Sequence, residues 1–173
     1  MTGTPKIGIR ELVEFVLRSG NLNASMNSQN TALEGARIHR QLQSQRFADY
    51  QKEFTLEKLV DMNHHDFLIH GRADGVVLDA EHPLIEEIKT SDMPFEELSE
   101  NTLTLYWGQV KVYAAILMAD EDLPELTIQL TYFQRLTKKI TQTEKQITRA
   151  EADDFLNDLI KDYAEWLRFR EEL

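Results

Sequence analysis

The chain has 173 residues, and 42% of them are hydrophobic, which suits a single domain with a substantial core. It contains no cysteine, so disulfide bonds, a thiolate nucleophile, a cysteine-ligated zinc ion and a cysteine-ligated iron–sulfur cluster are all excluded. Its net charge of −11 disfavours a polyanionic partner, because the mean field of the protein repels phosphate.

The sequence carries no sign of a membrane or secreted protein. No apolar run approaches the roughly 20 residues needed to cross a bilayer. The first residues lack the basic and then apolar layout of a signal peptide. We therefore expect a cytoplasmic protein with no membrane partner.

The charge is unevenly distributed along the chain. Residues 129–149 contain five basic residues and one acidic residue, whereas residues 150–173 contain eight acidic and three basic residues. The negative charge is therefore partly localised at the C-terminal end. A basic stretch of this kind is most often an ordinary solvated face.

Two helices are expected at the start of the chain. Apolar residues at helical spacing predict the first over residues 8–19, and a polar loop follows it. The second is expected from about Asn30 to Phe47, where Thr31 and Glu34 have the pattern of a capping box at the helix start.

Three consecutive antiparallel strands are expected next. The sequence pattern predicts strands over residues 53–60, 66–79 and 84–90. The last two strands would form a hairpin with a tight turn near Glu81.

The second half of the chain continues with a helix, a pair of strands and a final helix. Residues 103–119 are strongly apolar with helical spacing, and residues 126–136 and 139–147 read as strands. Thr148 and Glu151 form a second capping box, which marks the start of the last helix.

Charged residues lie on the predicted hairpin, where a sheet normally favours apolar side chains. Asp74 is on its first strand, and Glu87 and Lys89 project from one face of its second strand because side chains alternate. With a turn near Glu81, Asp74 would face Glu87, whereas Glu86 would point to the opposite face. Two neighbouring carboxylates repel unless one is protonated or a cation lies between them, and such oxygen ligands suit Mg²⁺ or Mn²⁺.

Lys89 would complete a hydrolytic site on this hairpin. An ammonium group beside a metal-bound water can hold the water, favour hydroxide or stabilise charge that develops on a phosphate. The hairpin alone leaves an active site and a surface hairpin with a cross-strand salt bridge equally open. If it is an active site, Glu87→Ala should abolish metal binding and Glu86→Ala should spare it.

Two further features lie on the predicted helices. Gln109 and Tyr113 are one turn apart on one face of their helix, where an amide on an apolar stripe needs a hydrogen-bond partner. His39 could join two carboxylates around a divalent metal ion. The alternatives are residues at the edge of the core for Gln109 and Tyr113, and an ordinary structural histidine for His39.

Taken in order, these residues resemble the motifs of the PD-(D/E)XK nuclease superfamily, and more narrowly its RecB-type exonuclease branch. The resemblance spans roughly residues 35–115. The matching positions are His39, Asp74 in GRADG, Glu87, Ile88 and Lys89 in EEIKT, and Gln109 with Tyr113.

The resemblance implies a divalent metal ion, Mg²⁺ or Mn²⁺, as the cofactor. It makes Asp74 and Glu87 the metal ligands, with the carbonyl group of Ile88 as an additional ligand. His39 would be a further ligand or would support a metal-bound water. Some relatives carry an iron–sulfur cluster on four cysteines, and this chain has none of them.

The resemblance also implies roles for the remaining positions. Lys89 would position or activate the attacking water. Gln109 and Tyr113 would contact DNA or orient the active site. The shared fold is an α/β fold with a central mixed β-sheet flanked by helices.

The biological setting implied by the resemblance is DNA repair or recombination, with single-stranded DNA ends as the favoured substrate. Similar nuclease modules are fused to helicases, including bacterial DinG-like enzymes in which the nuclease precedes the motor. The chain ends without a helix-stop signal, so we expect residues 1–173 to be one nuclease domain cut from a longer chain. A fused or associated helicase would supply the DNA affinity that the net charge disfavours.

Two other functions fit the same residues. A non-catalytic DNA-binding or scaffold domain would keep the fold but show no metal site sensitive to Asp74→Ala. A site-specific endonuclease would need base-reading elements, and 173 residues leave no room for an extra recognition domain.

Weaker candidates lie elsewhere in the chain. A histidine group near a hairpin turn could form a second metal site, and three aromatic residues could stack on bases, although a place in the core or at its rim suits them better. These residues are His64, His65 and His70, and Tyr106, Trp107 and Tyr132.

Overall fold

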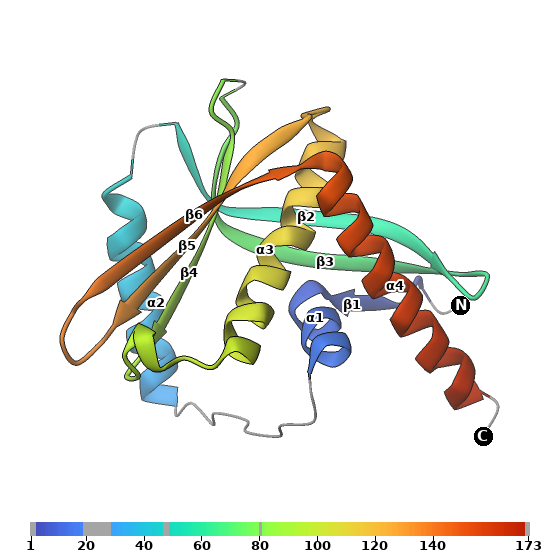
Figure 1. Cartoon of the computed structure of the whole chain (residues 1–173), viewed down its shortest axis with the longest axis horizontal. Helices are drawn as coiled ribbons and strands as arrows, with labels where there is room; N and C mark the ends of the chain where they lie inside the picture. Colours follow the sequence, from blue (N-terminus) through green and yellow to red (C-terminus); the bar gives the residue numbers. More distant parts are fainter. Residues whose placement is uncertain (1–2, 19–28, 47–48, 80, 172–173) are drawn as a thin grey trace.

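The computed structural model describes residues 3–18, 29–46, 49–79 and 81–171, which form a six-stranded sheet with helices on both faces (Figure 1). Among these residues, no helix combines the length and the apolar character that crossing a bilayer requires. In chain order the elements are β1 Lys6–Gly8, α1 Ile9–Leu17, α2 Gln29–Ser44, β2 Tyr50–Met62, β3 His65–Val77, β4 Leu84–Ser91, a 3₁₀ helix Phe95–Glu97, α3 Glu100–Asp120, β5 Glu125–Gln134, β6 Ile140–Thr148 and α4 Arg149–Glu171.

The sheet contains both parallel and antiparallel strand pairs. β2, β3 and β4 are antiparallel neighbours, and β5 and β6 form a second antiparallel pair. β1 runs parallel to β3, and β4 runs parallel to β5. The prediction of an α/β fold with a central mixed sheet is confirmed.

β3 has two strand neighbours along the same edge, with a gap between them. β2 pairs with the whole length of the other edge. β1 pairs with residues 68–70 and β4 pairs with residues 75–77. Residues 71–74 therefore have no strand neighbour on this side within the described part of the chain, and the sheet is open there.

The ladder between β2 and β3 is interrupted close to this gap. Its register skips Glu53 and Asp74, which lie opposite each other, and Glu53 has a φ of 56°. This left-handed conformation is uncommon for a residue other than glycine. The interruption changes the alternation of side chains, because Ala73 and Val76 both join the main core although they are three positions apart.

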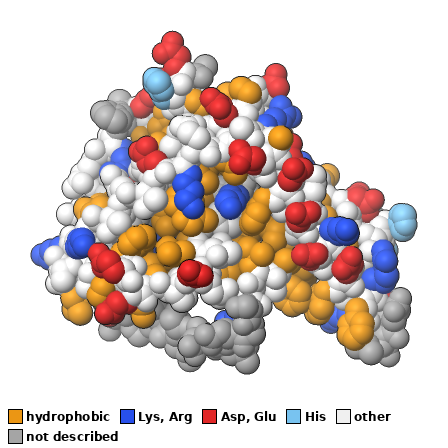
Figure 2. Space-filling view, in the orientation of Figure 1, with side chains coloured by type: hydrophobic (Ala, Val, Ile, Leu, Met, Phe, Trp, Pro, Cys, Tyr) orange, Lys and Arg blue, Asp and Glu red, His pale blue; other side chains and the backbone are white. Residues whose placement is uncertain are grey.

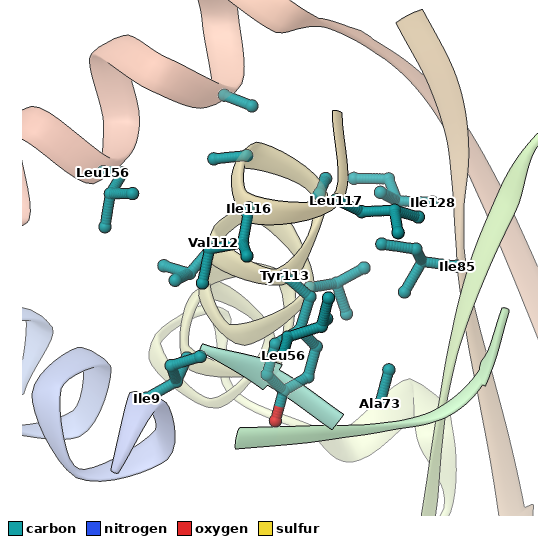
Figure 3. Packing of buried hydrophobic residues seen from close by; sticks show 14 of the residues in the cluster. Ile9, Leu56, Ala73, Ile85, Val112, Tyr113, Ile116, Leu117, Ile128 and Leu156 are labelled. Carbon is teal, nitrogen blue, oxygen red and sulfur yellow. The ribbon is translucent and has the colours of Figure 1, made fainter. Parts of the chain in front are cut away.

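Helices α1, α3 and α4 pack together on one face of the sheet, and α2 lies against β3 and β4 on the other face. α3 is buried on nearly every side, because its neighbours surround it (Figure 3). α1 approaches α3 closely at Gly108, where a Cβ atom would lie 2.8 Å from Val13 Cγ1. A small apolar cluster of Ile38, Leu42 and Ile88 attaches α2 to β4.

The predicted order of elements agrees with the structure except for β1 and the 3₁₀ helix, which were missed. The capping box at Thr148 is confirmed: Thr148 N donates to Glu151 Oε1 at 3.0 Å, and Glu151 N donates to Thr148 Oγ1 at 3.2 Å. The capping box predicted at Thr31 depends on a side chain outside the described part of the chain, and α2 spans Gln29–Ser44. Phe47 lies outside the described residues.

Candidate active site

Asp74, Glu87 and Lys89 come together where β3 meets β4. The register pairs Gly75 with Glu86, so Asp74 and Glu87 form the next opposed pair. Their carboxyl groups share a hydrogen bond, and Lys89 Nζ lies 3.2 Å from Glu87 Oε2. The structure thus brings together the three residues that the hairpin motif singled out.

β4 presents its two faces to different helices. Lys89 reaches α3, whereas the side chain of Ile88 packs against α2. The backbone of Ile88 still lies at the site, because its N–H group donates to Asp74 Oδ2 at 2.6 Å. Glu86 points away from Asp74, as the alternation of side chains predicts.

Helix α2 holds Asp74 through two side chains that are one helical turn apart. His39 Nδ1 lies 3.3 Å from Asp74 Oδ1. Gln43 is buried, and its Nε2 donates to the backbone oxygen of Asp74 at 2.6 Å. Sequence analysis missed Gln43, although its four-residue spacing from His39 was a usable signal.

Helix α3 holds Lys89 from the opposite side. Lys89 Nζ donates to Gln109 Oε1 at 2.7 Å, so Gln109 has the partner that a buried amide requires. The same ammonium lies 5.1 Å from the centre of the Tyr106 ring, which adds a cation–π contact. Contacts with Glu87, Gln109 and Tyr106 therefore fix the position of Lys89.

Tyr113 forms a wall behind the site. Its hydroxyl group points toward β3 (Figure 3) and hydrogen-bonds with the backbone of Arg72. Burial raises the pKa of Tyr113, and the charges of Glu87 and Asp74 raise it further. The ring lies so close to Gly71 that a Cβ atom there would be 2.9 Å from Tyr113 Cε1, which explains the glycine at this position.

The two carboxyl groups differ in their affinity for a proton. Burial would raise the pKa of Asp74, but its contacts with His39 and the Ile88 amide lower the pKa below its ordinary value. Burial raises the pKa of Glu87 to about 8. The charge of Lys89 partly opposes this increase, and the charge of Asp74 adds to it. Of the two carboxyl groups, Glu87 therefore holds a proton more readily than Asp74.

These residues line a hollow of about 560 Å³, which we call the first hollow. Its size lies within the range of about 300–1,000 Å³ that is usual for ligand sites. Its walls come from the start of α1, from α2, from the open stretch of β3, and from β4 and α3. Gly8, Ile9, Arg10, Ala36 and Arg72 also line it and were not predicted as site residues, whereas His70 was expected only at a separate metal site.

The donor groups in the first hollow fit a divalent metal ion. Within the described residues, no three His, Asp or Glu side chains are already arranged around a common metal position. His39, Asp74 and Glu87 nevertheless contact one another in series, with Asp74 in the middle. Removal of the proton between Asp74 and Glu87 would leave two carboxylates in contact, which require a cation. Carboxylate and carbonyl oxygens are the donors that Mg²⁺ and Mn²⁺ prefer.

Glu86 has a structural role on the far face of β4. It is fully buried and accepts hydrogen bonds from Arg46 Nε at 2.9 Å, Arg46 Nη2 at 2.6 Å, Tyr50 Oη at 2.7 Å and Gln129 Nε2 at 2.7 Å, and also from Thr131. Burial would raise its pKa, but these donors, led by Arg46, lower the pKa below the ordinary value. Glu86→Ala would leave several buried donors unpaired, so Glu86→Gln is the better control for metal binding.

The weaker candidates from the sequence do not assemble into a site. His64 and His65 lie at the exposed tip of the β2–β3 hairpin, whereas His70 lines the first hollow. Trp107 is 8% exposed and Tyr132 is fully buried, which confirms the core reading for both residues.

The basic stretch is largely engaged within the domain. Four of its five basic residues contact acidic or aromatic side chains: Arg135 with Asp92, Lys139 with Glu96, Arg149 with Asp122, and Lys145 with the Trp107 ring. Their charge is therefore partly neutralised locally, which agrees with the reading of an ordinary surface face.

Comparison with known proteins gives a family match and a similar fold. The model of the PD-(D/E)XK nuclease superfamily matches residues 11–172. A search of curated proteins finds no match. The crystal structure of SSO0001 is similar at a TM-score of 0.60 and 18% identity, covering 92% of this chain and 77% of that chain, and this supports the fold.

Two exonuclease structures are more distantly similar. One is a phage-related exonuclease from Haemophilus somnus 129PT, at a TM-score of 0.45 and 18% identity, covering 94% of this chain and 82% of that chain. The other is the alkaline exonuclease LHK-Exo from Laribacter hongkongensis, at a TM-score of 0.43 and 14% identity, covering 96% of this chain and 93% of that chain. TM-scores this low add nothing to the fold assignment.

Proposed function

Because the chain belongs to the PD-(D/E)XK nuclease superfamily, we propose that it is a deoxyribonuclease that depends on a divalent metal ion and hydrolyses phosphodiester bonds in the first hollow. One observation carries the proposal: Asp74, Glu87 and Lys89 meet in this hollow although two separate strands supply them. Two carboxyl groups and an ammonium group are the parts that metal-assisted hydrolysis of a phosphodiester requires.

Asp74, Glu87 and the carbonyl group of Ile88 would hold the metal ion, and His39 would be a further ligand or would support a bound water. Mg²⁺ or Mn²⁺ would act there as a Lewis acid and lower the pKa of a bound water. The Ile88 amide and Gln43 hold Asp74 in place through its side chain and backbone, respectively. Asp74 therefore needs little reorganisation to act as a ligand.

Lys89 would act on the phosphate and the attacking water. Its ammonium group is held 3.2 Å from Glu87 Oε2 and 2.7 Å from Gln109 Oε1, and it faces the first hollow. A fixed positive charge in a partly buried site stabilises negative charge that develops on a phosphate oxygen. Gln109 orients Lys89, and Tyr113 supports the strand that carries Asp74.

We further infer a RecB-type exonuclease that acts on single-stranded DNA ends in repair or recombination in the cytoplasm. The order of the motifs along the chain supports this narrower proposal. On the same basis, residues 1–173 would be one nuclease domain that works with a fused or associated helicase of the DinG-like kind.

The cleavage of labelled single- and double-stranded DNA tests the proposed activity. With Mn²⁺, the wild-type protein should degrade at least one of these substrates, and Lys89→Ala should reduce the rate by about a hundredfold or more. Lys161→Ala removes an exposed ammonium group on α4 and is the matched control, which should cleave at the wild-type rate. Absence of wild-type cleavage, or equal rates for wild type and Lys89→Ala, would contradict the proposal.

A further inference from the structure

A second hollow adjoins the first on the far side of Asp74. Its volume is about 610 Å³, and it is formed between α2 and the β2–β3 pair. The two hollows share Ala36, His39, Arg72 and Asp74 as lining residues, and we take His39 and Asp74 as the ridge between them. A polymer that crosses this ridge would enter both hollows at once.

Two cationic side chains in the second hollow have no partner within the described residues. Arg40 and Lys52 are exposed and line the hollow, and neither side chain makes an ion pair or hydrogen bond with any described residue. Arg72 also lines it, but its Nε lies 2.9 Å from Glu53 Oε2. The hollow therefore has two positive charges available for a ligand.

This placement contrasts with the rest of the charge on the molecule. Acidic side chains are spread along α4, on the face that Figure 2 shows. The basic stretch of β5 and β6 is largely paired within the domain. The unpaired cations of the second hollow are thus set beside the reactive groups of a protein whose net charge is −11.

We propose that the second hollow binds the phosphate next to the scissile one on a single nucleic-acid strand, with Arg40 and Lys52 as its contacts. The inference rests on the proposed function, because it takes the scissile phosphate to lie at Asp74, Glu87 and Lys89. A strand that crosses the ridge would place one phosphate in the first hollow and a neighbouring phosphate in the second. Local positive charge then supplies affinity that the net charge does not.

Glu53 lies at the same hollow and opposes this binding. Its carboxylate carries the one negative charge besides Asp74 among the described lining residues, and it pairs with Arg72. A phosphate in the hollow would be repelled by Glu53 and would compete with it for Arg72. Loss of this charge should therefore strengthen binding, which is the opposite of the effect expected for loss of Arg40 and Lys52.

Fluorescence anisotropy of a labelled single-stranded oligonucleotide tests the proposal, with a chelator present so that no cleavage occurs. Each phosphate contact contributes about 0.7 to the slope of log affinity against log salt for a single strand. The double variant Arg40→Gln/Lys52→Gln should reduce the magnitude of this slope by about 1.4. Its affinity should therefore rise about 25-fold less than that of wild type when the salt concentration falls from 1 M to 0.1 M. Glu53→Gln should strengthen binding about two- to fivefold at low salt.

The matched control removes two exposed cations elsewhere, Lys138 and Lys161, as Lys138→Gln/Lys161→Gln, and should keep the wild-type slope. The proposal is overturned if the wild-type protein does not bind, if Arg40→Gln/Lys52→Gln keeps the wild-type slope, or if the control loses as much. Failure of the proposed function would be seen separately. A protein that binds the oligonucleotide with these slopes but never cleaves it with Mn²⁺ would be a binding domain and not a nuclease.

Discussion

Glu86 and Glu87 are neighbours in the chain, but their surroundings drive their proton affinities in opposite directions. Glu86 accepts hydrogen bonds from four side chains, led by the Arg46 guanidinium, which lower its pKa despite burial. Glu87 has Lys89 and Asp74 beside it, and burial raises its pKa to about 8. One residue therefore suits a permanent structural charge, and the other suits a group that gives up a proton when a cation binds.

This contrast predicts opposite effects of pH on the stability of the metal-free protein. The ordinary pKa of a glutamate is 4.5, which stands for the unfolded state. The folded pKa of Glu87 is raised, so its contribution to the free energy of unfolding is complete below about pH 4.5 and is lost as the pH rises toward 8. The folded pKa of Glu86 is lowered, so its contribution is present above about pH 4.5 and is lost as the pH falls through its folded value.

Urea unfolding in the presence of a chelator measures how the free energy of unfolding changes between pH 5 and pH 8. Glu87→Gln should be more stable relative to wild type at pH 8 than at pH 5, because the variant has no proton to lose. In Glu86→Gln, the free energy of unfolding should still decline between pH 5 and pH 8, because Glu87 is unchanged. An identical decline in wild type and Glu87→Gln would show that Glu87 does not carry the raised pKa.

At the level of single residues, the sequence was informative where the alternation of side chains along a strand decides their direction. The two-residue period of a strand places Glu87 and Lys89 on one face and Glu86 on the other, and the structure shows that arrangement. The partners of Glu86 could not be inferred, because Arg46 and Thr131 come from distant parts of the chain. Only the tertiary fold brings those donors to one carboxylate.

At the scale of elements, helix α2 is attached to the sheet mainly through polar contacts and one small apolar cluster. Gln43 binds the backbone of Asp74, and Arg46, just beyond the end of the helix, binds Glu86 with two nitrogens. The apolar contribution is limited to residues such as Ile38 and Leu42. Because α2 also carries His39, the Arg46–Glu86 pair holds one side of the candidate active site in place.

Loss of this pair should be costly, since it would leave a carboxylate buried without its countercharge. Arg46→Met is expected to lower the free energy of unfolding by about 3 kcal/mol, the low end of the range for buried pairs because Arg46 keeps some contact with water. Arg37→Met changes an exposed arginine on the same helix and should stay within about 0.5 kcal/mol of wild type. Chemical denaturation compares the two, and equal stability would show that Glu86 does not depend on Arg46.

The gap in the edge of β3, at residues 71–74, is a second feature that arises from how the elements are arranged. It exists because β1 and β4 occupy the same edge of β3 and leave residues 71–74 between them. β1 has only three residues, too few for alternation to distinguish it from a loop, so sequence analysis missed it. The contribution of Arg10 to the first hollow was missed for the same reason, because β1 sets the position of α1 against β3.

At the scale of the whole molecule, the net charge does not describe the surroundings of the candidate active site. Part of the acidic charge lies on α4, whereas unpaired cations lie in the hollow beside the candidate active site. The sequence alone could locate the acidic end of the chain, but it could not show that Arg40 and Lys52, from α2 and β2, face the same space.

The fold as a whole was largely predictable, because apolar residues at helical spacing and strand-like apolar runs mark most of its elements. The mixed sheet and the order of the main elements agree with expectation. The contacts that define the two hollows depend on the broken ladder at Glu53 and on the gap in the edge of β3. Such irregularities do not appear in a hydrophobic pattern.

Our central claim is that Asp74 and Glu87 form the metal-binding part of a nuclease centre, while Glu86 serves the fold. Calorimetric titration with Mn²⁺ tests this claim most directly, with wild type, Glu87→Gln and Glu86→Gln compared at the same pH. We expect wild type and Glu86→Gln to bind the ion with similar affinity, and Glu87→Gln to lose at least about tenfold, as expected when a ligand itself rather than its support is removed. Absence of Mn²⁺ binding in wild type, or equal binding in all three proteins, would contradict the claim and favour a non-catalytic scaffold.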